Sequence, residues 1–190
     1  MRKPAIKRGK PAAQTLQAVG VAEAAAIMGV HFSTPQRMVE KGLLSSLVCP
    51  QRAGGGVRLI AIFDGEECES NYLDYELKIA ELGGKNDRRP RAHLHNRDNA
   101  LEHLANVEQP IAFADACGAA EAAKLLHVHA SFLTRLVRAD KLIGRSPWSL
   151  RGNSETRNWI FSRKSCLANL AAARKLAAAG NSVGRPRKMC

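Results

Sequence analysis

Two groups of hydroxyl, amide and guanidinium side chains, 98 residues apart, have the types and spacing that read DNA bases. The first group comprises Ser33, Thr34, Gln36 and Arg37. The second group comprises Ser131, Thr134, Arg135 and Arg138. Glutamine can form two hydrogen bonds with adenine and arginine two with guanine, while arginine also neutralises phosphates. We therefore interpret both groups as candidate DNA-binding residues.

The histidines and cysteines of the chain do not form a catalytic or metal-binding pattern. His93-x-His95 and His127-x-His129 lack the spacing of zinc sites, and the five cysteines are scattered along the chain. The glycines at 54–56 separate two predicted strands and do not precede a helix, so they do not predict a nucleotide-binding loop. We predict no catalytic residues, no metal, no cofactor and no enzymatic activity.

The first group lies in residues 21–44, which have the pattern of a helix-turn-helix. An apolar stripe at helical spacing ends at Ile27, and Gly29 follows where a turn needs a residue without a Cβ. Pro35 suits the first position of a second helix, and Gly42 its C-terminal stop. Such motifs place their second helix in the major groove of DNA.

A hairpin and a third helix are predicted next. Ser46–Pro50 and Val57–Phe63 read as two strands joined by a glycine-rich turn. Asp64 can cap a helix over Gly65–Leu82. The hairpin arginines that we expect to contact DNA are Arg52 and Arg58. The order helix, turn, helix, hairpin, helix is that of a winged helix-turn-helix.

The chain repeats itself. Residues 18–71 align with residues 116–169 without a gap, and 17 of these 54 positions are identical. The second copy predicts a hairpin between Pro147 and Phe161, then a helix capped by Ser162 and running to Ala179. The arginines expected around this second hairpin are Arg145, Arg151 and Arg157. We interpret the repeat as a tandem duplication.

The net charge of +12 points to a polyanionic partner, double-stranded DNA first. The excess lies in three segments, 1–15, 85–97 and 181–190. We expect a disordered basic tail, a basic linker and a second basic tail, which flank winged units at 16–84 and 98–180. Arg185 and Arg187 of the last tail resemble an AT-hook and would contact an A·T-rich minor groove.

The third helix of the first unit is acidic, unlike the rest of the chain. It carries Glu66, Glu67, Glu69, Asp74, Glu76 and Glu81. DNA would repel this face, so we expect it to mediate self-association or to bind a protein partner. No long apolar run or secretion signal is evident, and the cysteines suit a reducing compartment. We expect a cytoplasmic, nucleoid-associated protein of bacterial, phage or plasmid type that does not bind membranes.

Each unit resembles the winged helix-turn-helix of excisionase and MerR-like DNA-binding domains. In the first unit the resemblance rests on Glu23-Ala-Ala, Gly29-Val30, Ser33-Thr34, Arg37 and Gly42-Leu-Leu44. The second unit departs from the pattern, since His127 replaces the turn glycine and Asp140-Lys141 replaces Gly-Leu. The predicted fold class is therefore mainly α with short β-hairpin wings (α+β), in two tandem domains.

Three functions fit these patterns. The first is a sequence-specific DNA-binding protein, either a transcriptional regulator or an excisionase-like recombination factor of a mobile element. The second is an architectural protein that bends DNA. The third is an assembly adaptor of the phage-packaging type, which uses one unit for protein contacts.

Overall fold

The computed structural model describes residues 17–53, 56–81, 91–148 and 158–181. The first part contains β1 (Ala18–Gly20), α1 (Val21–Ile27), α2 (Thr34–Glu40), β2 (Ser46–Ala53), β3 (Gly56–Asp64) and α3 (Gly65–Glu81). A connecting region contains α4 (Arg91–Ala105) and the 3-10 turn η1 (Phe113–Asp115). The last part contains β4 (Ala116–Gly118), α5 (Ala119–Leu126), η2 (Ala130–Phe132), α6 (Leu133–Arg138), β5 (Gly144–Arg145), β6 (Ile160–Ser162), α7 (Arg163–Ala168) and α8 (Leu170–Asn181). The fold is mixed α+β, with two small antiparallel sheets.

The two sheets have the same order and the same register. β3 lies between β1 and β2, and β6 lies between β4 and β5. Val19 is opposite Phe63 in the first sheet, and Cys117 is opposite Phe161 in the second, a shift of 98 residues on both strands. The shift found in the sequence is therefore preserved in the backbone pairing. We call β1–α3 the first unit and β4–α8 the second unit.

Backbone turns are also conserved between the units, although the residues differ. Gly29 and Gly42 have φ of 65° and 68°, as the predicted turn and helix stop require. At the equivalent positions His127 and Asp140 both have φ of 53°. A side chain with a Cβ is strained in this left-handed region, although His and Asp tolerate it better than most. The duplicated fold thus imposes the same backbone on residues less suited to it.

The hairpin of the first unit is longer than expected, and two short strands were not predicted. β2 and β3 pair continuously, from Ser46 opposite Phe63 to Ala53 opposite Gly56. β1 lies directly before the predicted helix-turn-helix at residues 21–44, and β4 is its copy. Three residues carry no readable periodicity, so their strand character comes only from pairing with β3 and β6. The hairpin of the second unit is described only at its base, in β5 and β6.

The third helices differ between the units. Asp64 accepts a hydrogen bond from the Glu66 N–H at the start of α3, and Ser162 accepts one from the Ser165 N–H at the start of α7, which confirms both predicted caps. The prediction of one continuous helix after Ser162 was wrong, because Asn169 separates α7 from α8. The Asn169 amide bonds the carbonyl of Ser165, yet the equivalent Asn71 makes the same bond without interrupting α3. The amide alone therefore does not explain the break.

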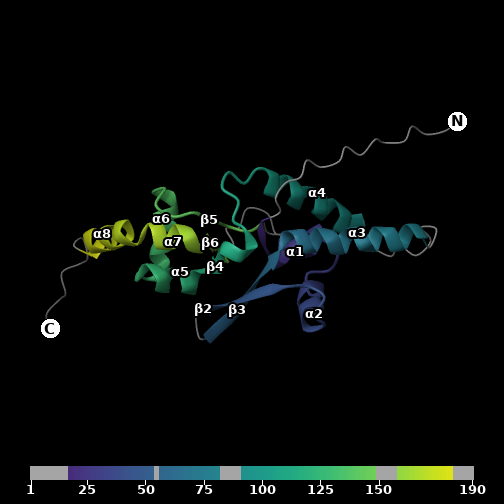
Figure 1. The fold of residues 1–190 in the computed structure, drawn as a ribbon, viewed down its shortest axis with the longest axis horizontal. Coiled ribbons are helices and arrows are strands. Elements are labelled where there is room, and N and C mark those ends of the chain that lie inside the picture. Colours follow the sequence, from purple (N-terminus) through teal and green to yellow (C-terminus); the bar gives the residue numbers. More distant parts are fainter. Residues whose placement is uncertain (1–16, 54–55, 82–90, 149–157, 182–190) are drawn as a thin grey trace.

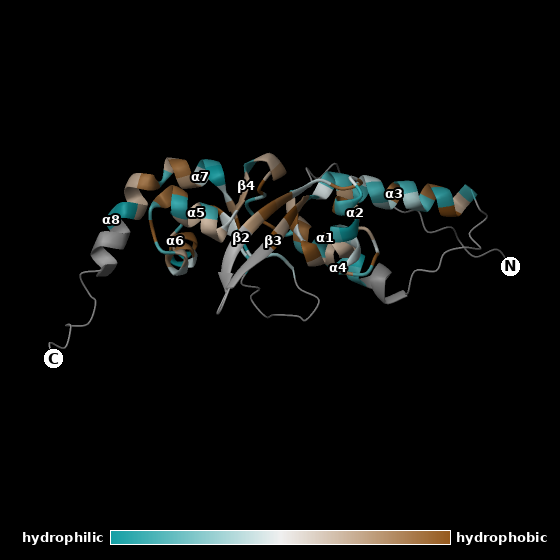
Figure 2. Cartoon of the chain, turned by 90° about the horizontal axis from the view of Figure 1, so that it is seen from below, coloured by the Kyte–Doolittle hydropathy of each residue, from teal (hydrophilic) through white to brown (hydrophobic). Residues whose placement is uncertain are grey.

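The units pack on each other through their sheets, in a pseudo-twofold arrangement. Ala18 and Ile62 of the first unit share one apolar cluster with their equivalents in the second. A Cβ on Gly20 would lie 2.8 Å from the Pro147 Cβ, and one on Gly118 would lie 2.6 Å from the Cys49 Cβ. These contacts exchange equivalent residues, as in a twofold-symmetric dimer. Figure 1 shows the units side by side along the long axis, and Figure 2 shows the apolar strands between the helical ends.

The predicted linker at 85–97 was wrong in its second half, because α4 begins at Arg91. Ala100 and Leu104 are buried, and Leu104 belongs to the core of the first unit. Arg97 bonds the carbonyl of Ile27, and its guanidinium lies 2.6 Å from a carboxylate oxygen of Glu69. Partly buried basic residues can be read as linker charge when their acidic partner is distant in sequence. α4 thus packs with the first unit, and the boundary expected at residue 98 falls inside it.

None of the helices in the described residues is both long enough and apolar enough to cross a membrane.

Candidate nucleic-acid interface

The start of α2 is built by a histidine and a serine. The Nδ1 atom of His31 lies 2.9 Å from the Ser33 hydroxyl and accepts a hydrogen bond from the Ser33 N–H at 3.4 Å. Because Nδ1 accepts from a backbone N–H, a neutral imidazole carries its proton on Nε2. Pro35 is buried and fixes the first turn of the helix. The imidazole nitrogen thus bonds the N–H of the residue directly before α2, and Ser33 itself forms no side-chain cap.

The predicted base-reading side chains of the first unit lie close together on this short helix. Gln36 and Arg37 are exposed, and Ser33 and Thr34 are half-buried. Phe32, directly before them, has 55% of its surface exposed and lies against the His31 ring. The helix end therefore offers an amide, a guanidinium and an aromatic ring to solvent.

The second unit repeats this geometry at η2 and α6. The Nδ1 atom of His129 lies 2.8 Å from the Ser131 hydroxyl and accepts from the Ser131 N–H at 3.3 Å. Arg135 and Ser131 are exposed, as is Arg138, and Thr134 is half-buried. The Arg135 guanidinium lies 5.9 Å from the ring centre of Phe132. The structure thus brings this predicted group together at one helix, as it does for its copy.

The sequence places His31 and His129 at the start of the predicted recognition helices, where a cap or a phosphate contact is the simplest role to expect. Both imidazoles are exposed, and each bonds its serine through Nδ1 and not through Nε2. An exposed ring N–H at the start of a helix can donate to a phosphate oxygen. The Val-His-x-Ser run, which recurs in both copies, is the sequence signal for this shared geometry.

The hairpin arginines are only partly placed. Arg52 lies on β2 and Arg58 on β3, one pair apart in the ladder, opposite Val57 and Gln51. The predicted site residues that lie outside the described ranges are Arg151, Arg157, Arg185 and Arg187.

The prediction of Arg145 as a surface hairpin residue was wrong. Its side chain is 8% exposed and forms two hydrogen bonds with the carboxylate of Glu23, at 2.7 and 2.9 Å. It also donates to the carbonyl of Ala18. A guanidinium held by these bonds inside the interface cannot reach DNA. In the first copy the equivalent residue is Leu47, so the repeat gave no sign of this role.

Glu23 is the centre of this polar contact between the units. Its side chain is fully buried, and it accepts hydrogen bonds from the N–H groups of Gly20 and Trp148, both at 2.8 Å. The equivalent Glu121 instead pairs with Arg163 of its own unit, where both side chains are 37% exposed. The same glutamate thus serves as an interface residue in one copy and as a surface residue in the other.

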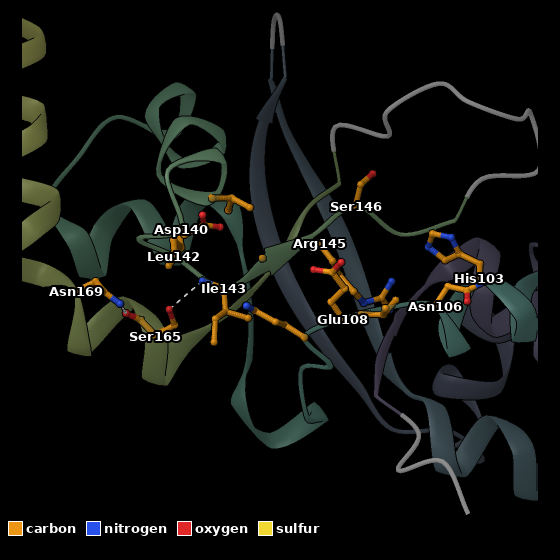
Figure 3. A pocket seen from close by; sticks show the side chains of 14 residues that line it. His103, Asn106, Glu108, Asp140, Leu142, Ile143, Arg145, Ser146, Ser165 and Asn169 are labelled. Carbon is orange, nitrogen blue, oxygen red and sulfur yellow. Dashed lines mark hydrogen bonds between the residues drawn. The ribbon is translucent and has the colours of Figure 1, made fainter. Parts of the chain in front are cut away.

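A cleft of about 600 Å³ runs between the end of α4 and the second unit, with Arg145 in its wall. Figure 3 shows Ser165 beside the backbone of Ile143, which donates to its hydroxyl at 2.9 Å. His103 and Glu108 come from the connecting region, and Asp140 and Asn169 from the second unit. Among the described residues no three His, Cys, Asp or Glu side chains are grouped to hold a metal ion.

The helices α2 and α6 lie on opposite sides of the long axis in Figure 1. This placement follows from the pseudo-twofold packing, which relates every element of one unit to its copy. The packing therefore relates the exposed Arg37 of α2 to the exposed Arg135 of α6.

No protein-family model, curated protein or solved structure matches this chain.

Proposed function

We propose that this protein binds double-stranded DNA through α2 and α6, as a tandem winged helix-turn-helix protein that regulates transcription or directs recombination. The observation that carries the proposal is a repeated local structure, in which His31 and His129 each accept a hydrogen bond from the serine N–H two residues later, directly before helices that expose Arg37 and Arg135. A short helix that exposes an arginine side chain is suited to the major groove.

The charge distribution supports the same conclusion. The chain carries 29 lysines and arginines against 17 acids. Exposed arginines on α2 and α6 are not needed to hold the core together, because the cores of both units are apolar. When positive side chains bind DNA, the counterions that surround the DNA are released, and this release increases the affinity. The affinity therefore depends strongly on salt.

Selection of bound sequences from a random DNA pool by the full chain tests the proposal. An enriched sequence motif is the expected result. Equal retention of all sequences, together with DNA bending, would favour the architectural function instead. Failure to retain DNA at low salt would refute both.

Variants then locate the interface. Arg37→Ala and Arg135→Ala should each lower the affinity for the selected sequence by about 1–3 kcal/mol if they contact bases. If they contact phosphates, they should lower binding to all sequences and reduce the salt slope by about 1. Lys78→Ala removes the same charge from α3 and serves as the matched control. Equal effects of all three variants would mean that net charge, and not these helices, determines binding.

A further inference from the structure

The third helices of the two units occupy equivalent places in the repeat but carry opposite charge. α3 contains six acids and one lysine, a net charge of −5. α7 and α8 together contain Arg163, Lys164, Arg174 and Lys175 and no acid, a net charge of +4. In an exact repeat these two elements would repel each other. In this chain they are electrostatic complements.

These helices lie at opposite ends of the molecule and point away from its centre (Figure 1). They cannot meet within one chain in this fold. A second copy displaced along the long axis brings its α8 beside α3 of the first, with the two helices antiparallel. The pseudo-twofold packing of the units is what places the complements at the two ends.

Both helices also expose apolar side chains next to their charges. On α3, Leu73 is 51% exposed and Leu77 is 63% exposed, one turn apart on the same face. On α7, Leu167 is 57% exposed, and Ala171 is exposed near the start of α8. Exposed leucines at helical spacing leave apolar area in water that a facing helix can cover.

The charges flank these apolar positions. Asp74 and Glu81 are exposed beside Leu73 and Leu77. Arg174 and Lys175 are exposed one turn after Ala171. An antiparallel pair of such helices buries leucine and alanine along its centre and places acids opposite bases. Antiparallel helices also have favourably opposed dipoles.

We propose that α3 of one copy docks on α7 and α8 of the next, so that the protein assembles head to tail. This contact uses two different surfaces, so it does not close on itself as a twofold contact does. Each added copy leaves one acidic and one basic end free, and the assembly grows as a chain. The proposal does not depend on DNA binding by α2 and α6.

Sedimentation velocity of the full chain without DNA tests the assembly. Species larger than the monomer should form at low salt and should dissociate as the salt rises from about 0.02 M to about 0.5 M, where screening is strong. A chain that stays monomeric at low salt and high protein concentration would overturn the proposal.

Charge reversal identifies the two surfaces. Asp74→Lys with Glu81→Lys reverses the charge at these two contact positions and changes the net charge of α3 from −5 to −1. Arg174→Glu with Lys175→Glu does the same on α8 and changes the net charge of α7 and α8 from +4 to 0. Each double variant alone should weaken self-association at least tenfold, while a mixture of the two should associate again, because each variant supplies the complement of the other. All four positions are exposed, so the circular dichroism spectrum and the melting temperature should stay near those of the parent chain.

Two other possible contacts of α3 would give different results in the charge-reversal experiment. If the chain's own basic residues at 85–89 cover α3, the α3 variant should lose stability, and mixing should restore nothing. If α3 pairs with α3 of another copy, the α8 variant should associate as strongly as the parent chain. Either result would overturn the head-to-tail contact.

Discussion

Replacing Glu23 by glutamine tests whether the buried ion pair holds the two units together. The substitution keeps the size of the side chain and removes its charge. It leaves Arg145 in the interface with a neutral amide and the carbonyl of Ala18 as partners. The interface would then contain a guanidinium without a counterion.

The geometry of the Glu23–Arg145 pair sets the size of the expected loss of stability. Both side chains are at least nine-tenths buried, and the two hydrogen bonds between them are 2.7 and 2.9 Å long. Removing one partner of a buried pair costs about 3–5 kcal/mol, because the other charge stays desolvated. Domains of this size have a free energy of unfolding of roughly 5–15 kcal/mol, so we expect a large fraction of the stability to be lost.

The repeat provides a matched control. Glu121 occupies the equivalent position and pairs with Arg163 at 2.8 Å, but both side chains are 37% exposed. Glu121→Gln should therefore cost only about 0.2–1 kcal/mol, as exposed pairs do. Because both variants replace the same residue type at equivalent positions, a difference between their losses of stability reports the effect of burial.

Urea denaturation followed by circular dichroism measures both losses. Arg145→Met completes a double-mutant cycle, in which we expect a coupling energy of about 2 kcal/mol or more with Glu23→Gln. Tryptophan fluorescence reports on the second unit, which contains Trp148 and Trp159. Equal losses for Glu23→Gln and Glu121→Gln would refute the reasoning, as would a coupling energy near zero.

Two further predictions concern the backbone and the thiols. Asp140→Gly should raise the free energy of unfolding by roughly 0.5–1 kcal/mol, because Asp140 has φ of 53°, and Gly42→Asp at the equivalent position should lower it. Urea denaturation measures both changes, and a loss of stability in Asp140→Gly would contradict the strain argument. Burial raises the pKa of the Cys68 thiol in the folded chain, whereas the unfolded thiol ionises near 9. This thiol should therefore lower the free energy of unfolding by about 1.4 kcal/mol per pH unit above about pH 9. Denaturation curves across pH should show that Cys68→Ala removes this contribution. If the free energy of unfolding of the variant fell as steeply with pH as that of the parent chain, the prediction would be wrong.

The sequence alone determined the local structure wherever the signal was local. Gly29 and Gly42 marked the turn and the helix stop, Asp64 and Ser162 marked two helix starts, and the hairpin followed from its β-branched residues. These features depend on the conformational preferences of one residue or on short-range periodicity. The 98-residue repeat then extended each assignment to a second copy, including turns where His127 and Asp140 replaced glycine.

The tertiary structure decided what depends on residues far apart in the chain. β1 and β4 are strands only because they pair with β3 and β6, and α4 belongs to the first unit because its buried face packs on α1. Arg145 looked like any hairpin arginine until Glu23, 122 positions away, proved to be its partner. An arginine looks the same in a sequence whether its side chain faces water or a buried carboxylate. Only the packing of the two units distinguishes these environments.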